Sequence, residues 1–480
     1  MMLIRLFREA RWTTSALLVI LLLRLLSLGA YPLTDTTEAR YGEMVRKMVE
    51  LGDWVTPWFD YGVPFWGKPP LAFWLSAASA SVLGVNEFSL RLPSYLLGLG
   101  MLGLVGRLAW QHGGPARSAL AMLVLASSVL FFVCSGAVLT DTALAFSVTL
   151  AMTAYWLGVV SPSRHSGRWR MVFFGALGLG LLAKGPVGLV LSAAPILFWA
   201  VPYEYLRASL RCMPWIAGLL TMSTIAIPWY LLAEHRTPGF LQYFLVGENF
   251  LRFVDPLWSG DRYGSVHDAP HGYIWLLWVA SILPWSVVLP VIWFTTRRSV
   301  LGMSSNRHQP AWNAYLLCFA LAPCLFFTLA GSVLPTYVLP ALPTFALWTA
   351  NQIFAYGSST VLRRTAISAA ILPAIFVGLL PVLNTNVAAD KSQYQLLTAL
   401  PVNADVVYFP KRPFSAQFYS NGHAISAASI DDLQLIVSKK PGVYIAISTQ
   451  QSLPEELKSG YQMIMVAGAK REYALWRPAQ

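Results

Sequence analysis

Ionisable residues gather between two long apolar stretches, in residues 33–70. The candidates for chemistry there are Asp35, Glu38, Arg40, Tyr41 and Lys68. A carboxylate can take a proton from a hydroxyl group or orient it, while lysine, arginine and tyrosine can hold a phosphate and offset its charge as it leaves. The segment therefore has the residue types of a reactive site at a membrane surface.

Further candidates lie near the ends of other apolar stretches. They are Asp141 in Leu139-Thr-Asp-Thr, Lys184 in Ala183-Lys-Gly-Pro, Glu248, Arg252 and His271 in the polar segment 234–272, and Tyr337 in Leu334-Pro-Thr-Tyr-Val-Leu-Pro. Each type also has an ordinary structural interpretation. Aspartates cap the helices that follow them, lysines extend to the membrane surface, and arginine and tyrosine pack against aromatic or interfacial groups.

A metal site has little support in the sequence. The two histidines His267 and His271, with Asp268 beside them, suggest a metal site only superficially, because no further ligand follows at a fixed spacing. We expect no required cofactor, with a divalent metal as the weaker alternative. The four cysteines lie in or beside apolar stretches without metal-ligand spacing, which indicates packing rather than a disulfide framework or a zinc site.

The composition indicates a polytopic membrane protein. Of the 480 residues, 56% are hydrophobic and 12% are charged, against about 25% charged in soluble domains. The net charge of +12 comes from short clusters between apolar runs. Such clusters indicate membrane topology and give no support for a nucleic-acid partner.

The apolar runs predict an all-α membrane domain. A first span at 12–30 follows Arg5, Arg8 and Arg11, which places the N-terminus in the cytoplasm. Ten more spans are expected at 91–110, 118–138, 142–160, 171–183, 186–202, 213–233, 273–295, 312–330, 335–354 and 365–384. Basic residues, Arg297, Arg298 and Arg307 among them, fall in the loops placed inside. Because some of these runs are short, the expected number of spans is eleven to thirteen. Arg24, within the first span, should face the interior of the bundle.

Two domains are expected, a membrane domain at 1–385 and a small α/β domain at 390–480 outside the cytoplasm. The membrane domain has large outside loops at 31–90 and 234–272. The first loop should contain interfacial helices at 44–51 and 71–84, with Arg46, Lys47 and Glu50 on the polar side of the former. The α/β domain should have strands at 406–409, 443–447, 463–466 and 473–476, and a helix capped by Ser429 and Asp432.

The candidate residues all lie on the outer side of this topology, which favours an enzyme that acts at the outer leaflet. Outside the cytoplasm no nucleotide-sugar pool exists, so a sugar on a polyprenyl phosphate is the expected donor. The first alternative is a lipid or solute transporter, which would need ionisable groups near mid-membrane depth. The second is a non-catalytic scaffold that presents the C-terminal domain.

The same residues resemble a known family. Asp35-Thr-Thr-Glu-Ala-Arg-Tyr-Gly-Glu-Met, Gly52-Asp-Trp-Val-Thr-Pro and Gly67-Lys-Pro-Pro resemble the first outside loop of the protein-mannosyltransferase-like membrane glycosyltransferases. The similarity is strongest to the bacterial branch that contains the aminoarabinose transferase of lipid A. It extends through Asp141, Lys184-Gly-Pro, Glu248-Asn-Phe-Leu-Arg-Phe, Gly260-Asp-Arg-Tyr-Gly and the Tyr337 motif, over most of residues 1–385.

The resemblance implies the C-type glycosyltransferase fold and an inverting transfer from a polyprenyl-phosphate sugar to lipid A, another envelope glycan or a protein, in a bacterial plasma membrane. It implies catalytic roles for Asp35 and Asp141. Lys68, Arg252, Tyr337 and Lys184 would bind the donor phosphate, and Glu38, Arg40, Tyr41, Glu248 and His271 would support the site.

The chain departs from the aminoarabinose enzymes in two places. Those enzymes have an aspartate directly before the glutamate, whereas Thr36 and Thr37 separate Asp35 from Glu38 here. Their glutamate before Lys-Pro is Gly67 in this chain, which removes a metal ligand that the resemblance would otherwise imply.

Overall fold

A computed structural model describes residues 2–161, 164–255, 258–264, 269–296, 309–355, 359–401, 403–467 and 472–479. His267 and Asp268 of the metal hypothesis, and the arginines at 297, 298 and 307, lie outside the described residues. The chain forms two compact units. The first comprises residues 1–25, 53–75 and 91–375, and the second comprises residues 26–52, 76–90 and 376–480.

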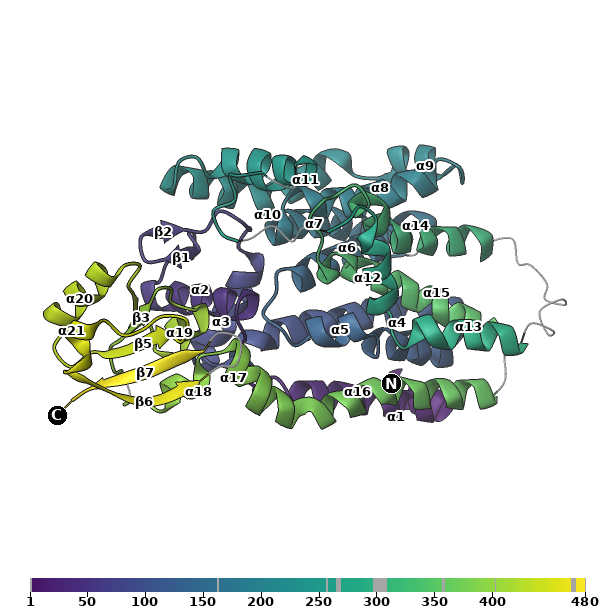
Figure 1. Cartoon of the computed structure of the whole chain (residues 1–480). Helices are drawn as coiled ribbons and strands as arrows, with labels where there is room; N and C mark the ends of the chain where they lie inside the picture. The colour runs from purple at the N-terminus through teal and green to yellow at the C-terminus, as the bar shows by residue number, and fades with distance from the viewer. Residues whose placement is uncertain are drawn as a thin grey trace. The chain divides into compact units, whose positions relative to one another are not determined.

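Helices make up most of the described chain before residue 390 (Figure 1). In chain order they are α1 (Met2–Leu26), α2 (Thr37–Leu51), α3 (Leu71–Leu83), α4 (Glu87–Ala126), α5 (Val129–Cys134), α6 (Asp141–Tyr155), η1 (Trp156–Val160), α7 (Ser166–Lys184), α8 (Pro186–Ala200), α9 (Tyr205–Cys212) and α10 (Trp215–Arg236). They continue as η2 (Gln242–Leu251), α11 (Arg252–Val254), α12 (Tyr273–Ser281), α13 (Trp285–Thr296), α14 (Gln309–Phe327), η4 (Pro335–Ala341), α15 (Leu342–Ala355), α16 (Ser359–Val382), η5 (Leu383–Val387) and α17 (Ala388–Lys391).

Most predicted spans correspond to one helix or to a helix pair. The pair at 91–110 and 118–138 begins as the single element α4, which breaks at Gly113 and Gly114. Gly114 has φ of 74°, a conformation that glycine adopts without steric cost. The span expected at 273–295 is the pair α12 and α13, bent by 79°. The span at 335–354 begins as the 3-10 helix η4, because Pro340, inside this segment, lacks the amide hydrogen that a regular α-helix needs.

By length and composition, five helices in the described part of the chain can cross a membrane, or six if the bent pair counts as one span. Two shorter apolar helices, α3 and α8, accompany them. The predicted count of eleven to thirteen therefore stays a prediction. The interior position expected for Arg24 is confirmed, because this side chain is 2% exposed and donates Nη2 to the Val133 carbonyl at 2.9 Å.

The second unit contains a five-stranded mixed sheet, yellow in Figure 1. Its strands are β3 (Val406–Phe409), β4 (Ala424–Ser426), β5 (Tyr444–Ser448), β6 (Tyr461–Ala467) and β7 (Tyr473–Pro478), in the order β4-β3-β5-β7-β6. Strand β3 is parallel to β4 and β5, whereas β7 is antiparallel to β5 and β6. The four predicted strands are confirmed, and β4 was not predicted because it has only three residues.

Both faces of this sheet are covered, and β3 is buried on both sides. The accompanying helices are α18 (Tyr394–Thr398), α19 (Phe414–Tyr419), α20 (Ile430–Lys439) and α21 (Glu455–Lys458). The predicted capping box of α20 is present, with Ser429 and Asp432 bonded reciprocally. The predicted domain limits at 385 and 390 stay a prediction, and the second unit also takes in residues 26–52 and 76–90 of the first loop.

The prediction that the helix at 44–51 has a solvent-exposed polar side is wrong. In α2, Arg46 is 6% exposed and Lys47 is fully buried. Arg46 pairs with Glu43 at 2.7 Å and with Glu50 at 2.9 Å, and Lys47 lies 3.6 Å from Glu43. Because these charges have partners within the unit, the side that amphipathic spacing assigned to water is largely packed against protein.

Candidate functional site

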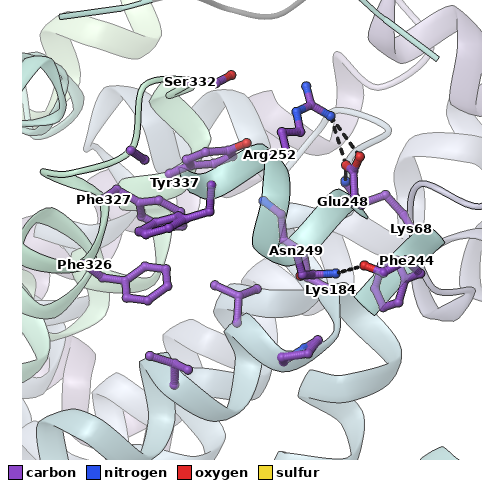
Figure 2. Close-up of a pocket in the computed structure, with 15 residues that line it drawn as sticks. Lys68, Lys184, Phe244, Glu248, Asn249, Arg252, Phe326, Phe327, Ser332 and Tyr337 are labelled. Carbon is purple, nitrogen blue, oxygen red and sulfur yellow. Dashed lines mark hydrogen bonds and ion pairs between the residues drawn. The ribbon is translucent and has the colours of Figure 1, made fainter. Parts of the chain in front are cut away.

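A cavity of about 210 Å³ in the first unit brings together residues from four segments of the chain. Its polar lining includes Lys68, Lys184, Glu248, Arg252 and Tyr337. All five were candidates from the sequence. Figure 2 shows Lys68 and Arg252 directed at the carboxylate of Glu248, with Tyr337 across the pocket.

Lys184 lies where α7 ends and α8 begins. Gly185 between them has φ of 77° and ψ of −147°, and Pro186 starts α8. Glycine can adopt this backbone conformation, and proline at the first helical position loses no helical hydrogen bond. A Cβ atom at Gly185 would also lie 2.6 Å from the Phe244 ring. The Lys-Gly-Pro sequence therefore places the ammonium group at the pocket through local geometry.

We expect Gly185→Ala to lower the apparent melting temperature of the purified protein. The combination of positive φ and strongly negative ψ costs an alanine about 1–3 kcal/mol, and the contact with Phe244 adds strain. Gly103→Ala is the matched control, because a Cβ at Gly103 meets nothing within 4 Å. Equal melting temperatures for the two variants would show that the turn does not depend on glycine.

Asp141 pairs with Lys184 at the first turn of α6. The two side chains are each 10% exposed. The Lys184 ammonium also lies over the Tyr337 ring, 4.3 Å from its centroid, at a distance typical of a cation–π contact. Asp141 does not line the pocket itself, so its contact with the pocket runs through Lys184.

Tyr263, in the segment that follows Trp258, fixes the backbone just before Lys68. The Tyr263 hydroxyl donates to the Pro64 carbonyl at 2.8 Å and accepts from the Trp66 amide at 3.1 Å. Lys68 donates to the Gly67 carbonyl at 2.7 Å and to Glu248 Oε1 at 2.5 Å. A Cβ at Gly67 would meet the Phe65 ring at 2.8 Å, so the glycine that departs from the aminoarabinose enzymes is packed tightly in this chain.

Glu248 is the central carboxylate of the pocket. It lies on η2, one turn before Arg252, whose Nη1 contacts both of its oxygens at 3.0 and 3.1 Å. Asp261 lies 3.5 Å from the same Arg252 nitrogen. Burial alone would raise the pKa of Glu248, but Lys68 and Arg252 lower it below its ordinary value, and the carboxylate stays ionised.

The pocket thus combines preorganised cations with an apolar wall. Lys68, Lys184 and Arg252 are balanced by Glu248, Asp141 and Asp261, so their charges sum to zero. In the described chain, Lys68 uses two of its three ammonium donors, which leaves one for a ligand. Phe326, Phe327 and other apolar residues form the opposite wall. This arrangement can hold a phosphate group that is attached to an apolar chain.

Comparison with known proteins agrees with this geometry. Residues 14–244 match the family described as dolichyl-phosphate-mannose-protein mannosyltransferase. The undecaprenyl phosphate-alpha-4-amino-4-deoxy-L-arabinose arabinosyl transferase 1 of Pseudomonas fluorescens (strain Pf0-1) is 30% identical over 351 residues, which are 70% of this chain and 57% of the relative. Over residues 14–244 the chain is thus similar to the protein-mannosyltransferase-like family.

A second relative, the corresponding transferase of Enterobacter sp. (strain 638), is 28% identical over 72% of this chain and 60% of its own length. The chain therefore spans less than two thirds of the curated relatives that it matches. The crystal structure of ArnT from Cupriavidus metallidurans bound to undecaprenyl phosphate has a TM-score of 0.76, at 20% identity and 98% coverage of both chains.

A more distant fold match is the archaeal oligosaccharyltransferase AglB from Archaeoglobus fulgidus, with a TM-score of 0.51 at 13% identity, over 92% of this chain and 70% of that one. The expected fold, a helical membrane domain of the C-type glycosyltransferase class with a small C-terminal sheet region, is confirmed. Together with its apolar helices, this fold identifies the chain as a multi-pass membrane protein.

The other predicted site residues do not line the pocket. Asp35, Glu38, Arg40 and Tyr41 belong to the second unit, at the start of α2. Asp35 accepts hydrogen bonds from the Ser415 amide at 3.1 Å and from the Ser415 hydroxyl. Arg40 lies over the ring of Tyr41 at 5.3 Å. His271 is exposed, two residues before α12 begins.

Some pocket residues were not predicted. Asp261, which contacts Arg252 but does not line the cavity, lies in the Gly-Asp-Arg-Tyr motif that supported the family resemblance, so that motif was a usable signal. Asn249 donates to the Phe244 carbonyl at 2.7 Å, and Ser332 and Phe244 line the cavity. No spacing pattern connects these residues. Among the described residues, no group of three or more His, Cys, Asp or Glu side chains has the arrangement of a metal site.

Proposed function

We propose that this protein is an inverting glycosyltransferase that moves a sugar from an undecaprenyl-phosphate-type donor to an envelope acceptor. The observation that carries the proposal is the pocket, where Lys68, Lys184 and Arg252 stand opposite an apolar wall. The names of the curated relatives, which are undecaprenyl-phosphate-dependent transferases, support the same donor class. The acceptor class is lipid A, another envelope glycan or a protein.

In the proposed step, an acceptor oxygen attacks the anomeric carbon of the sugar from the side opposite the phosphate. The bond between this carbon and the phosphate oxygen breaks, and the polyprenyl phosphate leaves with the electron pair. The leaving phosphate has more negative charge than the phosphodiester of the donor. Lys68, Lys184 and Arg252 therefore stabilise charge that develops during transfer, which is how preorganised donors accelerate a reaction.

Asp35 takes the proton of a hydroxyl acceptor in this proposal. With a phosphate acceptor no proton needs to be removed, and Asp35 orients the acceptor. Asp141 acts through its ion pair by holding Lys184 toward the pocket. Glu248 holds Lys68 and Arg252 in the same way. No metal ion is needed for this step, and Glu38, Arg40, Tyr41 and His271 have supporting roles.

The proposed location is the plasma membrane of a bacterium, with the N-terminus in the cytoplasm and the pocket and C-terminal domain on the outer side. The distribution of arginines between the predicted loops supports this orientation. None of the matches described above is a transporter, whereas the curated relatives are transferases by name.

The proposal is tested by a transfer assay with the purified full chain. Labelled undecaprenyl-phosphate sugars serve as donors, and an envelope-lipid extract supplies the acceptor. We expect turnover by the wild type, and a rise of at least about tenfold in the donor KM of Arg252→Gln, because hydrogen bonds to charged groups contribute about 1.5–3 kcal/mol.

Arg236→Gln is the matched control, because this arginine is 52% exposed and pairs with Asp53 away from the pocket lining. Its donor KM should equal that of the wild type. Absence of turnover across the donor series, or equal KM values for the two variants, would contradict the proposed function of the pocket.

A further inference from the structure

The short helix α19 of the C-terminal domain contacts the first loop along its whole length. Ser415 donates to Asp35, and Gln417 lies 3.5 Å from the Lys47 ammonium. The Tyr419 hydroxyl accepts from the Leu33 amide at 2.6 Å. These first-loop residues and α19 all belong to the second unit, although more than 350 residues separate them in the chain.

The packing along this contact is tight. Ser415 and Gln417 are 0% and 1% exposed, and Lys47 is fully buried. Tyr419 also donates to Glu87 at 2.8 Å, which adds a contact just before the chain enters the long part of α4. A buried polar group without its partner is costly. The register between α2 and α19 is therefore strongly specified.

Asp35 lies at the end of this contact. Both of its carboxylate oxygens accept hydrogen bonds from Ser415, and its own amide donates to the Lys391 carbonyl at 2.7 Å. These two bonds fix the orientation of the carboxylate. The residue that the family resemblance makes catalytic is thus held from two sides by the C-terminal part of the chain.

We propose that the C-terminal domain orients the catalytic carboxylate, with Ser415 as a positioning residue for Asp35; this inference rests on the proposed glycosyl transfer. The domain acts on the chemical step, because a carboxylate that has lost its donor samples orientations in which it cannot reach the acceptor proton. Donor binding is independent of Ser415, since the phosphate contacts come from Lys68, Lys184 and Arg252.

The first test compares the full-chain wild type with Ser415→Ala in the labelled undecaprenyl-phosphate-sugar assay. We expect kcat to fall about tenfold, the value of one hydrogen bond to a charged group, with the donor KM unchanged. Ser415→Thr, which keeps the hydroxyl, should restore most of the rate. Ser438→Ala is the matched control, because Ser438 is exposed on α20 and donates within its own helix.

The second test is amide hydrogen exchange of the same four proteins. The amides of Leu33 and Asp35 donate to groups in the C-terminal part of the chain. We expect faster exchange in residues 33–41 of Ser415→Ala, and unchanged exchange there in Ser438→Ala. This measurement needs no turnover, so it still reports on the contact when no donor is accepted.

The outcomes separate the two proposals. A lower kcat with unchanged KM and faster exchange supports the positioning role. An unchanged kcat for Ser415→Ala overturns it, and so does an equal loss of activity and melting temperature in Ser438→Ala. If the wild type turns over no donor, the proposed function fails. Faster exchange in residues 33–41 of Ser415→Ala would then still support the proposal that Ser415 orients Asp35, and unchanged exchange would contradict that proposal.

Discussion

Replacing Asp35 with asparagine is expected to lower glycosyl transfer to a hydroxyl acceptor about 10²- to 10⁴-fold, the contribution typical of general base catalysis. Asparagine has nearly the same shape. Its oxygen can accept from the Ser415 amide and its NH2 group can donate to the Ser415 hydroxyl, so the fold should be retained. What it loses is the ability to take a proton. The measurement is kcat with the labelled donor at equal amounts of folded protein, together with donor binding.

Asp60→Asn is the control for this change. It makes the same substitution in the first loop, where the Asp60 carboxylate accepts from the Tyr61 amide and does not line the pocket. A loss in Asp35→Asn that is confined to hydroxyl acceptors would identify Asp35 as the base. A small loss with all acceptors would leave it an orienting role, and an unchanged kcat would remove Asp35 from the chemistry.

Replacing Asp141 with alanine is expected to cost about 3–5 kcal/mol of stability, because the mutation leaves the Lys184 ammonium buried without its carboxylate. Each side chain of the pair is 10% exposed, and Lys184 is the last residue of α7, directly before the Gly185 turn. The double variant Asp141→Ala/Lys184→Met should recover much of the loss, since neither charge remains. The measurement is the apparent melting temperature of the four proteins of the cycle in one detergent.

The exposed pair of Glu455 and Lys458 provides the comparison. These side chains are 83% and 45% exposed, and exposed ion pairs contribute about 0–1 kcal/mol. Glu455→Ala should therefore leave the melting temperature nearly unchanged. If Asp141→Ala behaved like Glu455→Ala, or if the double variant were less stable than Asp141→Ala, the pair would not position Lys184 as proposed.

Local chemistry explains which predictions agreed with the structure. The Lys-Gly-Pro turn, the capping box at Ser429 and the strands β3, β5, β6 and β7 depend on residues within a few positions of one another. The burial of Arg24 follows from the cost of a charge in an apolar span. Such effects act within one segment, and the order of residue types is sufficient to reveal them.

The polar side of α2 shows where local chemistry was insufficient. Spacing alone assigned Arg46 and Lys47 to water, because charged residues usually occupy the exposed side of a helix. In the structure Glu43, on the same helix, pairs with both, and Gln417 approaches Lys47 from the C-terminal domain. The helical period cannot reveal a partner that is 370 positions away in the chain.

The sequence by itself determined the membrane class, the C-type glycosyltransferase fold, the strands of the C-terminal domain and the residue types of the pocket. Tertiary structure decided the pairings, which join Lys68 to Glu248, Lys184 to Asp141 and Asp35 to Ser415 across 180, 43 and 380 positions. The physical reason is that hydropathy and turn chemistry act through neighbours in the chain. Charge compensation instead depends on which groups the folded chain brings within about 3 Å of each other.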